Sequence, residues 1–342
     1  MTTLYLIRHA EAEGNLYRRI HGQFDTNVTP NGRRQIAALA RRFASIDIDA
    51  CYSSDLTRTQ TTAQAIAAPK GLPLRLEPGF REINLGIWED RPFGWLYAFE
   101  QEEMHHFNQE PRLWHVAGAE RFEEYTARFI AALTRVAQAH DGGTAAIFSH
   151  GAVMRGVMMA LFPEVEIPHC DNTAVTRLFY DGGAFTLDFF NDNSHLTGNL
   201  STLSRQKWWR NDGKRQDVNL WFRQEHGTVP GLTAPEGETY TAYCGEDPAG
   251  LLVLRDRGAA GEIVYMGLRE AYRGQGLAVQ LFGQAVFTLR AAGKARLILT
   301  RPADCPAFDA LLRQMDLRPD SQGRCAMELK LQVFPLLEEA LV

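Results

Sequence analysis

Three segments of the sequence place arginine or histidine side chains shortly after apolar runs. They are Arg8 and His9 after Leu4–Ile7, Arg58 after Ala50–Ser53, and His150 after Ala145–Ser149. Guanidinium groups present a planar fork of donors that suits phosphate oxygens, and an uncharged histidine nitrogen is a nucleophile toward phosphorus. These residue types in this pattern predict phosphoryl transfer.

Over about the first 200 residues, the apolar runs alternate with amphipathic stretches that would position these side chains. The amphipathic stretches are Gly32–Ala44, Leu56–Ala67 and Ala152–Leu161. This alternation predicts an α/β fold with a largely parallel sheet flanked by helices. Because ligand crevices form at the carboxyl ends of strands in such sheets, the arginines and histidines are expected to meet there.

Residues 90–140 interrupt the alternation. They contain an aromatic-rich helical stretch, Phe93–Phe107, and a second predicted helix, Glu120–Ala139. Such an insertion is expected to roof a pocket. A strand at Phe185–Phe190 then precedes a polar segment, residues 191–217, that lacks periodicity.

Five ordered motifs resemble those of the histidine phosphatase superfamily, also called the phosphoglycerate mutase-like family. They are LIRHAEAEGN, TPNGRRQIAALA, CYSSDLTRTQTTAQAI, FREINLGIWED and IFSHGAVMRGV. The resemblance covers about residues 2–200, and Ala10 stands where the family usually has glycine. It implies a three-layer α/β phosphoglycerate mutase-like domain.

The resemblance also implies a role for each matched residue. His9 would be the nucleophile that forms phosphohistidine, with Arg8, Asn15, Arg58 and His150 binding the phosphoryl oxygens. Glu82 would be the general acid and base, which requires a raised pKa in an apolar pocket. Preorganised cations stabilise charge on the transferring group, so no metal is expected.

The same family contains mutases and phosphatases, and the insertion favours a phosphatase. It lacks the extra basic residues with which phosphoglycerate mutases grip a substrate carboxylate. Instead it carries aromatic and acidic side chains: Trp95, Tyr97, Phe99, Phe107, Trp114, Glu100, Glu102, Glu103 and Glu110. We therefore expect a phosphomonoester with a neutral, cationic or flat leaving group, and a mutase is the nearest alternative. His105, His106 and His115 are interpreted as surface or lid residues, and His195 as structural.

The second half of the chain predicts a different α+β arrangement. Its predicted strands are Asn219–Arg223, Thr239–Cys244, Gly250–Leu254, Glu262–Leu268, Ala295–Thr300 and Ala326–Val333, and its predicted helices are Leu277–Ala292 and Pro306–Met315. A glycine-rich turn follows the fourth strand and opens the first helix. Backbone N–H groups at such a turn bind pyrophosphate.

This turn resembles the acetyl-coenzyme A loop of GNAT-type N-acetyltransferases, over about residues 215–333. The resemblance implies that one segment binds the pantetheine arm and the next binds the pyrophosphate of acetyl-coenzyme A. The matched residues are Tyr265, Met266, Leu268, Arg273, Gly274, Gln275, Gly276, Leu277 and Ala278.

The C-terminal half departs from the GNAT pattern at the acceptor side. Cys305 and Leu312 stand near the positions of the usual asparagine and tyrosine, and few residues separate the first two strands. Coenzyme binding is thus more strongly predicted than acetyl transfer. Three hypotheses remain open: a phosphatase with an acetyltransferase-like domain, a phosphatase regulated by a non-catalytic acyl-coenzyme A module, and a bifunctional enzyme acting on one metabolite.

Length and composition agree with two domains, which we place at residues 1–204 and 205–342. The net charge is −5 without a marked basic excess in either half, so nucleic acid is not an expected partner. No apolar run reaches the length of a membrane span, and no leader segment is recognised, so a cytoplasmic protein is expected. The five cysteines lack a CxxC pair, and neither disulfides nor zinc are expected.

Overall fold

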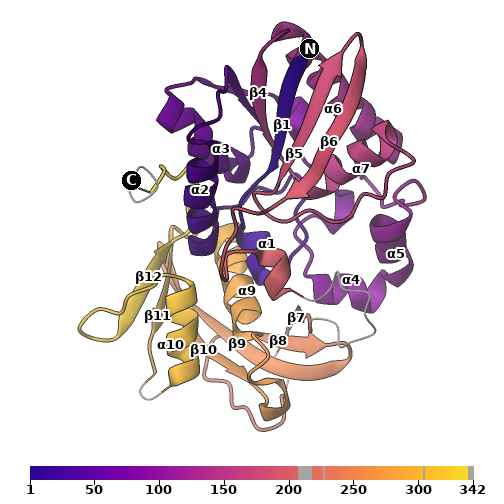
Figure 1. The fold of residues 1–342 in the computed structure, drawn as a ribbon. Helices are drawn as coiled ribbons and strands as arrows, with labels where there is room; N and C mark the ends of the chain where they lie inside the picture. The colour runs from indigo at the N-terminus through magenta and orange to yellow at the C-terminus, as the bar shows by residue number, and fades with distance from the viewer. Residues whose placement is uncertain (207–217, 226–227, 303–304, 338–342) are drawn as a thin grey trace.

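The computed structural model describes residues 1–206, 218–225, 228–302 and 305–337, and it contains two sheets, each with its own helices (Figure 1). The first sheet has the strand order β3-β2-β4-β1-β5-β6. Its strands are β1 (Thr2–Arg8), β2 (Ala50–Ser53), β3 (Leu74–Leu76), β4 (Thr144–Ser149), β5 (Val175–Asp181) and β6 (Ala184–Asp192). The first four are parallel, and β5 and β6 form an antiparallel hairpin beside β1.

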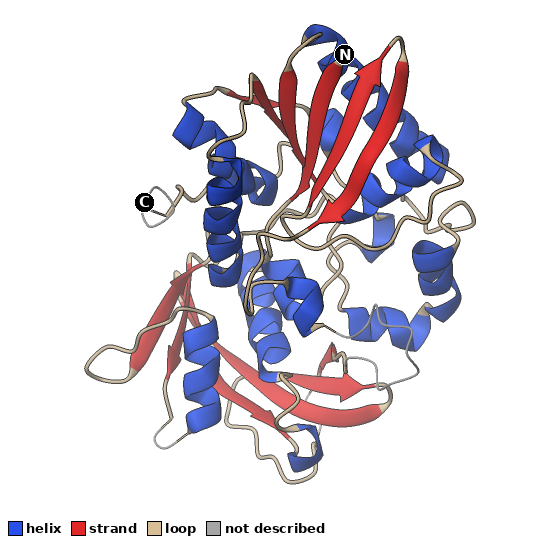
Figure 2. Ribbon diagram, in the orientation of Figure 1, coloured by secondary structure: helices blue, strands red, loops and turns tan. Residues whose placement is uncertain are grey.

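Alternate residues of β1 face two different helical layers, because successive side chains of a strand point to opposite faces. Leu4 and Leu6 belong to the core formed with α6 (Phe122–Ala139) and α7 (Gly151–Leu161), whereas Tyr5 and Ile7 belong to the core formed with α2 (Pro30–Phe43) and α3 (Thr57–Lys70). Figure 2 shows helices on both faces of this sheet. The predicted three-layer α/β domain is confirmed.

The insertion differs from its prediction. Instead of one helical stretch over Phe93–Phe107, the chain forms α4 (Phe93–Phe99) and α5 (Gln101–Gln109), because the backbone leaves helical geometry at Glu100, with φ −130°. Two further short helices, α1 (Glu13–Tyr17) and α8 (Thr202–Arg205), were not predicted.

The second sheet has the order β12-β11-β10-β9-β8-β7 and is antiparallel except between β10 and β11. Helices α9 (Ala278–Ala291) and α10 (Pro306–Gln314) pack with it in one hydrophobic core. Its strands are β7 (Trp221–Gln224), β8 (Glu238–Cys244), β9 (Asp247–Arg257), β10 (Ala260–Leu268), β11 (Arg296–Thr300) and β12 (Arg324–Glu328). The closing strand ends five residues before the predicted Val333.

The segment between the two sheets is described only in part. The proposed division after residue 204 falls within α8, and residues 207–217 of the polar segment lie outside the described residues. Of the described residues between β7 and β8, none is helical. Throughout the parts of the chain that the structure describes, no helix is both long and apolar enough to cross a membrane.

Candidate active site

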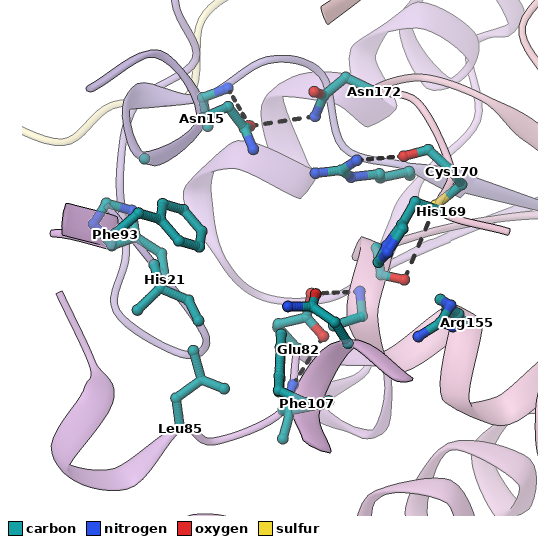
Figure 3. A pocket seen from close by; sticks show the side chains of 18 of the residues that line it. Asn15, His21, Glu82, Leu85, Phe93, Phe107, Arg155, His169, Cys170 and Asn172 are labelled. Atoms are coloured by element: carbon teal, nitrogen blue, oxygen red, sulfur yellow. Dashed lines mark hydrogen bonds between the residues drawn. The ribbon is translucent and has the colours of Figure 1, made fainter. Parts of the chain in front are cut away.

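A cavity of about 160 Å³ lies where β1 and β4 end, and Figure 3 shows the side chains around it. Five of the six predicted catalytic and phosphate-binding residues line it: Arg8, His9, Asn15, Arg58 and Glu82. The sixth, His150, is buried next to His9, with 5.2 Å between the ring centroids. The fold therefore brings all six predicted side chains together.

His9 is buried, and its hydrogen bond defines which ring nitrogen can react. Nδ1 lies 2.7 Å from the carbonyl oxygen of Ala10. Because a carbonyl oxygen only accepts, Nδ1 must carry the proton, and Nε2 keeps its lone pair. Burial, together with the guanidinium groups of Arg58 and Arg8, lowers the pKa of His9 well below its ordinary value. The ring is thus uncharged at neutral pH, with Nε2 able to attack phosphorus.

His150 is held in the complementary tautomer. Its Nε2 lies 3.0 Å from the hydroxyl oxygen of Ser54, and that oxygen already accepts the N–H of Leu56. We assign the hydroxyl hydrogen to this contact, which places the ring proton on Nδ1. Nδ1 is buried and has no hydrogen-bond partner among the described residues. Burial, followed by Arg58, lowers the pKa of His150, so it is a neutral donor suited to a phosphoryl oxygen.

Backbone carbonyls orient the two arginines before any ligand arrives. Arg58 is 1% exposed and donates to the carbonyl oxygens of Phe24 (2.9 Å) and Gly22 (2.6 Å). Arg8 donates from Nη1 to the carbonyl oxygen of Cys170 (2.5 Å), and its buried Nε has no partner in the described structure. Fixed cations away from water stabilise transferring phosphoryl charge without reorganising. No group of three or more histidine, cysteine or acidic side chains among the described residues could hold a metal ion.

Asn15 and a second asparagine complete the phosphate side of the cavity. The side-chain oxygen of Asn15 accepts the N–H of Ala12 (3.0 Å) and Nδ2 of Asn172 (3.3 Å), so its amide hydrogens remain for a ligand. Asn172 also donates to the backbone oxygen of His9 at 2.9 Å and lines the cavity. The sequence did not predict Asn172. Recognising β5 as a strand antiparallel to β1 would have placed it, because β5 starts at this edge of the sheet.

Glu82 lies against the start of α7 and is buried. Its carboxylate accepts the N–H groups of Ala152 (3.0 Å), Val153 (2.6 Å) and Ile83 (3.0 Å). Burial raises the pKa of Glu82, and these three donors oppose the rise without cancelling it. The carboxyl group consequently keeps its proton to higher pH than an exposed glutamate does, as a general acid requires.

The insertion turns its aromatic side chains, and not its glutamates, toward the cavity. The lining includes Phe93, Tyr97, Phe107 and Trp114. None of the four glutamates between residues 100 and 110 lines it. The acidic side chains, on which the prediction of a neutral or cationic leaving group depended, therefore do not line the cavity.

A cation that the sequence did not predict lies on the opposite side of the cavity from Phe93 and His21 (Figure 3). Arg155 of α7 donates from Nε to the carbonyl oxygen of Ile167 at 3.1 Å and has no carboxylate partner among the described residues. His169 lies beside it, and burial with the nearby Arg155 lowers the pKa of His169 to about 4. The position of Arg155, one helical turn after Gly151, could have indicated that it reaches the site.

The other histidines singled out by the sequence do not line the cavity. His105 is exposed and lies 3.5 Å from Glu110, in agreement with a surface residue. His195 contacts Arg42 of α2 through Nδ1 (3.2 Å) and the hydroxyl of Thr173, just before β5, through Nε2 (3.1 Å). Its interpretation as structural agrees with these contacts.

The glycine-rich segment of the second domain has the geometry of an anion-binding turn. β10 pairs with β11 only as far as Ile263, so beyond it Tyr265, Met266 and Leu268 have β9 on one side and no strand on the other among the described residues. Gly274 and Gly276 both have positive φ, +73° and +74°. Their N–H groups make no hydrogen bond within the described structure, and α9 begins directly afterwards.

The remaining residues of this segment support the turn. Arg273 donates from Nε to the carbonyl oxygen of Leu268 at 3.0 Å, and the side chain of Gln275 donates to the carbonyl oxygen of Ala271 at 2.8 Å. Leu277 is the N-terminal capping residue of α9, and Ala278 is its first helical residue. At the acceptor side, Leu312 is buried in the hydrophobic core and Cys305 precedes α10.

Fold and site together define a histidine phosphatase-type domain joined to an acetyltransferase-type domain. The sequence model of the histidine phosphatase superfamily (branch 1) matches residues 4–193, and the chain belongs to this family. The model of the acetyltransferase (GNAT) family matches residues 201–314.

Individual relatives match the first domain. A protein described as a probable phosphoglycerate mutase GpmB from Yersinia pestis (strain Pestoides F) is 34% identical over 161 residues, which span 47% of this chain and 75% of the relative. The structure of Bacillus stearothermophilus YhfR is 31% identical, with a TM-score of 0.54, over 57% of this chain and 99% of that chain. A mutant Entamoeba histolytica phosphoserine phosphatase in complex with phosphoserine is 29% identical, with a TM-score of 0.50, over 57% of this chain and 100% of that one.

Proposed function

We propose that this chain hydrolyses phosphomonoesters through a phosphohistidine intermediate on His9. The observation that carries the proposal is the buried, uncharged His9 ring. Its Nδ1–H donates to the carbonyl oxygen of Ala10, and the guanidinium groups of Arg8 and Arg58 line the same cavity. This arrangement supplies a nucleophile and charge stabilisation in one cavity.

The proposed reaction has two displacements. In the first, Nε2 of His9 forms a bond to phosphorus, the phosphorus–oxygen ester bond breaks, and Glu82 gives its proton to the leaving oxygen. In the second, the Glu82 carboxylate takes a proton from water, the hydroxide attacks phosphorus, and the phosphorus–nitrogen bond breaks to release inorganic phosphate. Arg8, Arg58, Asn15 and His150 hold the phosphoryl oxygens through both steps.

A phosphoglycerate mutase-type transferase is the second candidate. Two observations favour it: the curated relative carries that description, and Arg155 offers a cation to a carboxylate on the substrate. The insertion, by contrast, contributes no charged side chain to the cavity lining, which supports the phosphatase. The aromatic wall and Arg155 together fit a leaving group that is small and carries an anionic group, in contrast to the neutral, cationic or flat leaving group predicted from the sequence.

A matched substrate panel distinguishes these candidates. We expect wild-type enzyme to release inorganic phosphate, and to prefer phosphoserine over phosphoethanolamine and 3-phosphoglycerate over glycerol phosphate, because only the first member of each pair carries a carboxylate for Arg155. Phosphate release and product identity are followed together. Interconversion of 2- and 3-phosphoglycerate without phosphate release would contradict the phosphatase and establish the mutase.

We further propose that the second domain binds acetyl-coenzyme A, with the pantetheine arm along Tyr265–Leu268 and the pyrophosphate at Arg273–Ala278. The open edge of β10 and the two glycines with positive φ support this proposal. A buried Leu312 and the short β7–β8 connection favour binding without acetyl transfer.

A Gly276→Ala variant should weaken acetyl-coenzyme A binding about tenfold, because alanine at positive φ is strained by about 1–2 kcal/mol and reorients the N–H groups. Gly293→Ala is the matched control, since Gly293 has φ +70° and open space around it but lies at the far end of α9. Isothermal titration calorimetry measures both. Absence of binding by wild-type protein at near-millimolar ligand would exclude the coenzyme site.

A further inference from the structure

The wall of the catalytic cavity that carries Asn15 is backed by a helix of the second domain. Asn15 belongs to α1, which has only five residues and is too short to be stable alone. In Figure 1, α1 lies directly beside α9, and Tyr17 of α1 belongs to the hydrophobic core of the second domain.

An ion pair between Arg290 and Glu13 joins α9 to α1. Arg290 of α9 donates from Nη1 and Nη2 to the two carboxylate oxygens of Glu13, both at 2.9 Å. Glu13 is 5% exposed, and one of its oxygens also accepts the N–H of Asn27 at 3.1 Å. A bidentate guanidinium–carboxylate pair fixes orientation as well as distance. Removing Arg290 would leave a buried carboxylate without its partner, which is strongly unfavourable.

Close packing fixes the other end of α1. A Cβ atom on Gly283 of α9 would lie 2.4 Å from Cβ and Cγ of Tyr17, so only glycine permits this approach. The Tyr17 ring lies 6.1 Å from the ring of Phe282 and 6.0 Å from that of Phe287, measured between centroids. The side chain of Tyr17 is 2% exposed.

Arg19 and His21, which follow α1 in the same cavity wall, also contact α9. Arg19 donates to the side-chain oxygen of Gln284 at 2.9 Å and stacks over Phe287. The His21 ring lies 5.2 Å from the Phe287 ring. Both Arg19 and His21 line the catalytic cavity. Thus one helix of the second domain supports the cavity wall from α1 to His21.

Two hydrogen bonds of Asn172 connect α1 to the backbone of His9. Glu13 and Tyr17 lie two residues before and after Asn15. Asn15 accepts from Asn172, which in turn donates to the backbone oxygen of His9. Movement of α1 would therefore displace both the proposed phosphate donor and the asparagine bonded to the nucleophile's backbone.

From this geometry we propose that Arg290 and Gly283 of the acetyltransferase-type domain are positioning residues for phosphoryl transfer in the first domain. The second domain completes the phosphate-binding wall, and the two domains form one catalytic unit. The inference rests on the proposed function, but its test includes binding of an oxyanion, which needs no turnover.

The test compares Arg290→Ala and Arg290→Lys in the full chain, with Arg296→Ala as control because Arg296 forms an exposed pair with Glu328. Hydrolysis, the dissociation constant of orthovanadate, the affinity for acetyl-coenzyme A and the thermal unfolding midpoint are measured. We expect Arg290→Ala to lower kcat/KM and to weaken vanadate binding, each at least about tenfold, with unchanged coenzyme affinity. Arg290→Lys should recover part of both losses, and Arg296→Ala should match wild type.

Folded Arg290→Ala protein with wild-type kcat/KM and vanadate affinity would overturn the proposal. If Arg290→Ala fails to fold, Arg290→Lys provides the test, because lysine keeps the positive charge but cannot make the bidentate contact with Glu13. Wild-type kcat/KM and vanadate affinity in Arg290→Lys would then overturn the proposal. If wild-type protein binds vanadate but hydrolyses nothing, the proposed function fails while the vanadate comparison still tests the positioning role.

Discussion

A His9→Ala variant loses hydrolysis of every phosphomonoester that wild-type protein accepts, with kcat reduced by a factor of about 10⁴ or more. The reason is that Nε2 of His9 is the proposed nucleophile, with Nδ1 held by the Ala10 carbonyl oxygen, and alanine removes it. Because Arg8, Arg58 and Asn15 remain, the variant should still bind orthovanadate.

His105→Ala provides the matched control, since this imidazole is exposed and does not line the cavity. Phosphate release and vanadate binding are compared for the three proteins. A folded His9→Ala variant that retains more than about a tenth of wild-type kcat would contradict the assignment of the nucleophile.

The second large effect is expected from Glu82→Gln and depends on the leaving group. For alkyl phosphates, kcat should fall by about 10²–10⁴, because glutamine cannot donate a proton to a poor leaving oxygen. An aryl phosphate leaves without that proton, so its first step survives. The variant should then release one equivalent of the phenol in a burst and turn over slowly, since no base activates water against the phosphohistidine.

The pH profile of the wild-type enzyme should report the same group. With alkyl phosphates, kcat should fall as pH rises through the raised pKa of Glu82, because the acid is then deprotonated. On the acidic side, activity should persist well below the ordinary histidine pKa, since the pKa of His9 is lowered.

An equal loss on both substrate types in Glu82→Gln, without a burst, would show that Glu82 does not protonate the leaving group.

Much of this site could be predicted from the sequence because local patterns place its residues. The residues of Leu4–Ile7 are apolar and pack alternately on the two faces of the sheet. This apolar run predicts a buried strand and places Arg8 and His9 at its carboxyl end. The same holds for His150 after β4. The resemblance to a known family then related Glu82 and Asn15 to that strand end.

Other features depend on contacts between distant segments and could not be predicted in this way. Asn172 reaches the site only through the antiparallel pairing of β5 with β1. The division of the insertion into α4 and α5 depends on the non-helical backbone at Glu100. The pair of Glu13 and Arg290 joins residues 277 positions apart, and no periodicity in either segment indicates it.

In the proposed reaction, His9 carries the phosphoryl group during turnover. The most direct measurement is to quench the enzyme during hydrolysis of a labelled phosphomonoester, under alkaline conditions that preserve phosphorus–nitrogen bonds, and to map the label by peptide mass spectrometry. We predict phosphohistidine at His9 in the wild-type protein, accumulation of it in Glu82→Gln with an aryl phosphate, and none in His9→Ala. Steady hydrolysis by wild-type protein with no label at His9, or with the label on another residue, would show that His9 is not the nucleophile.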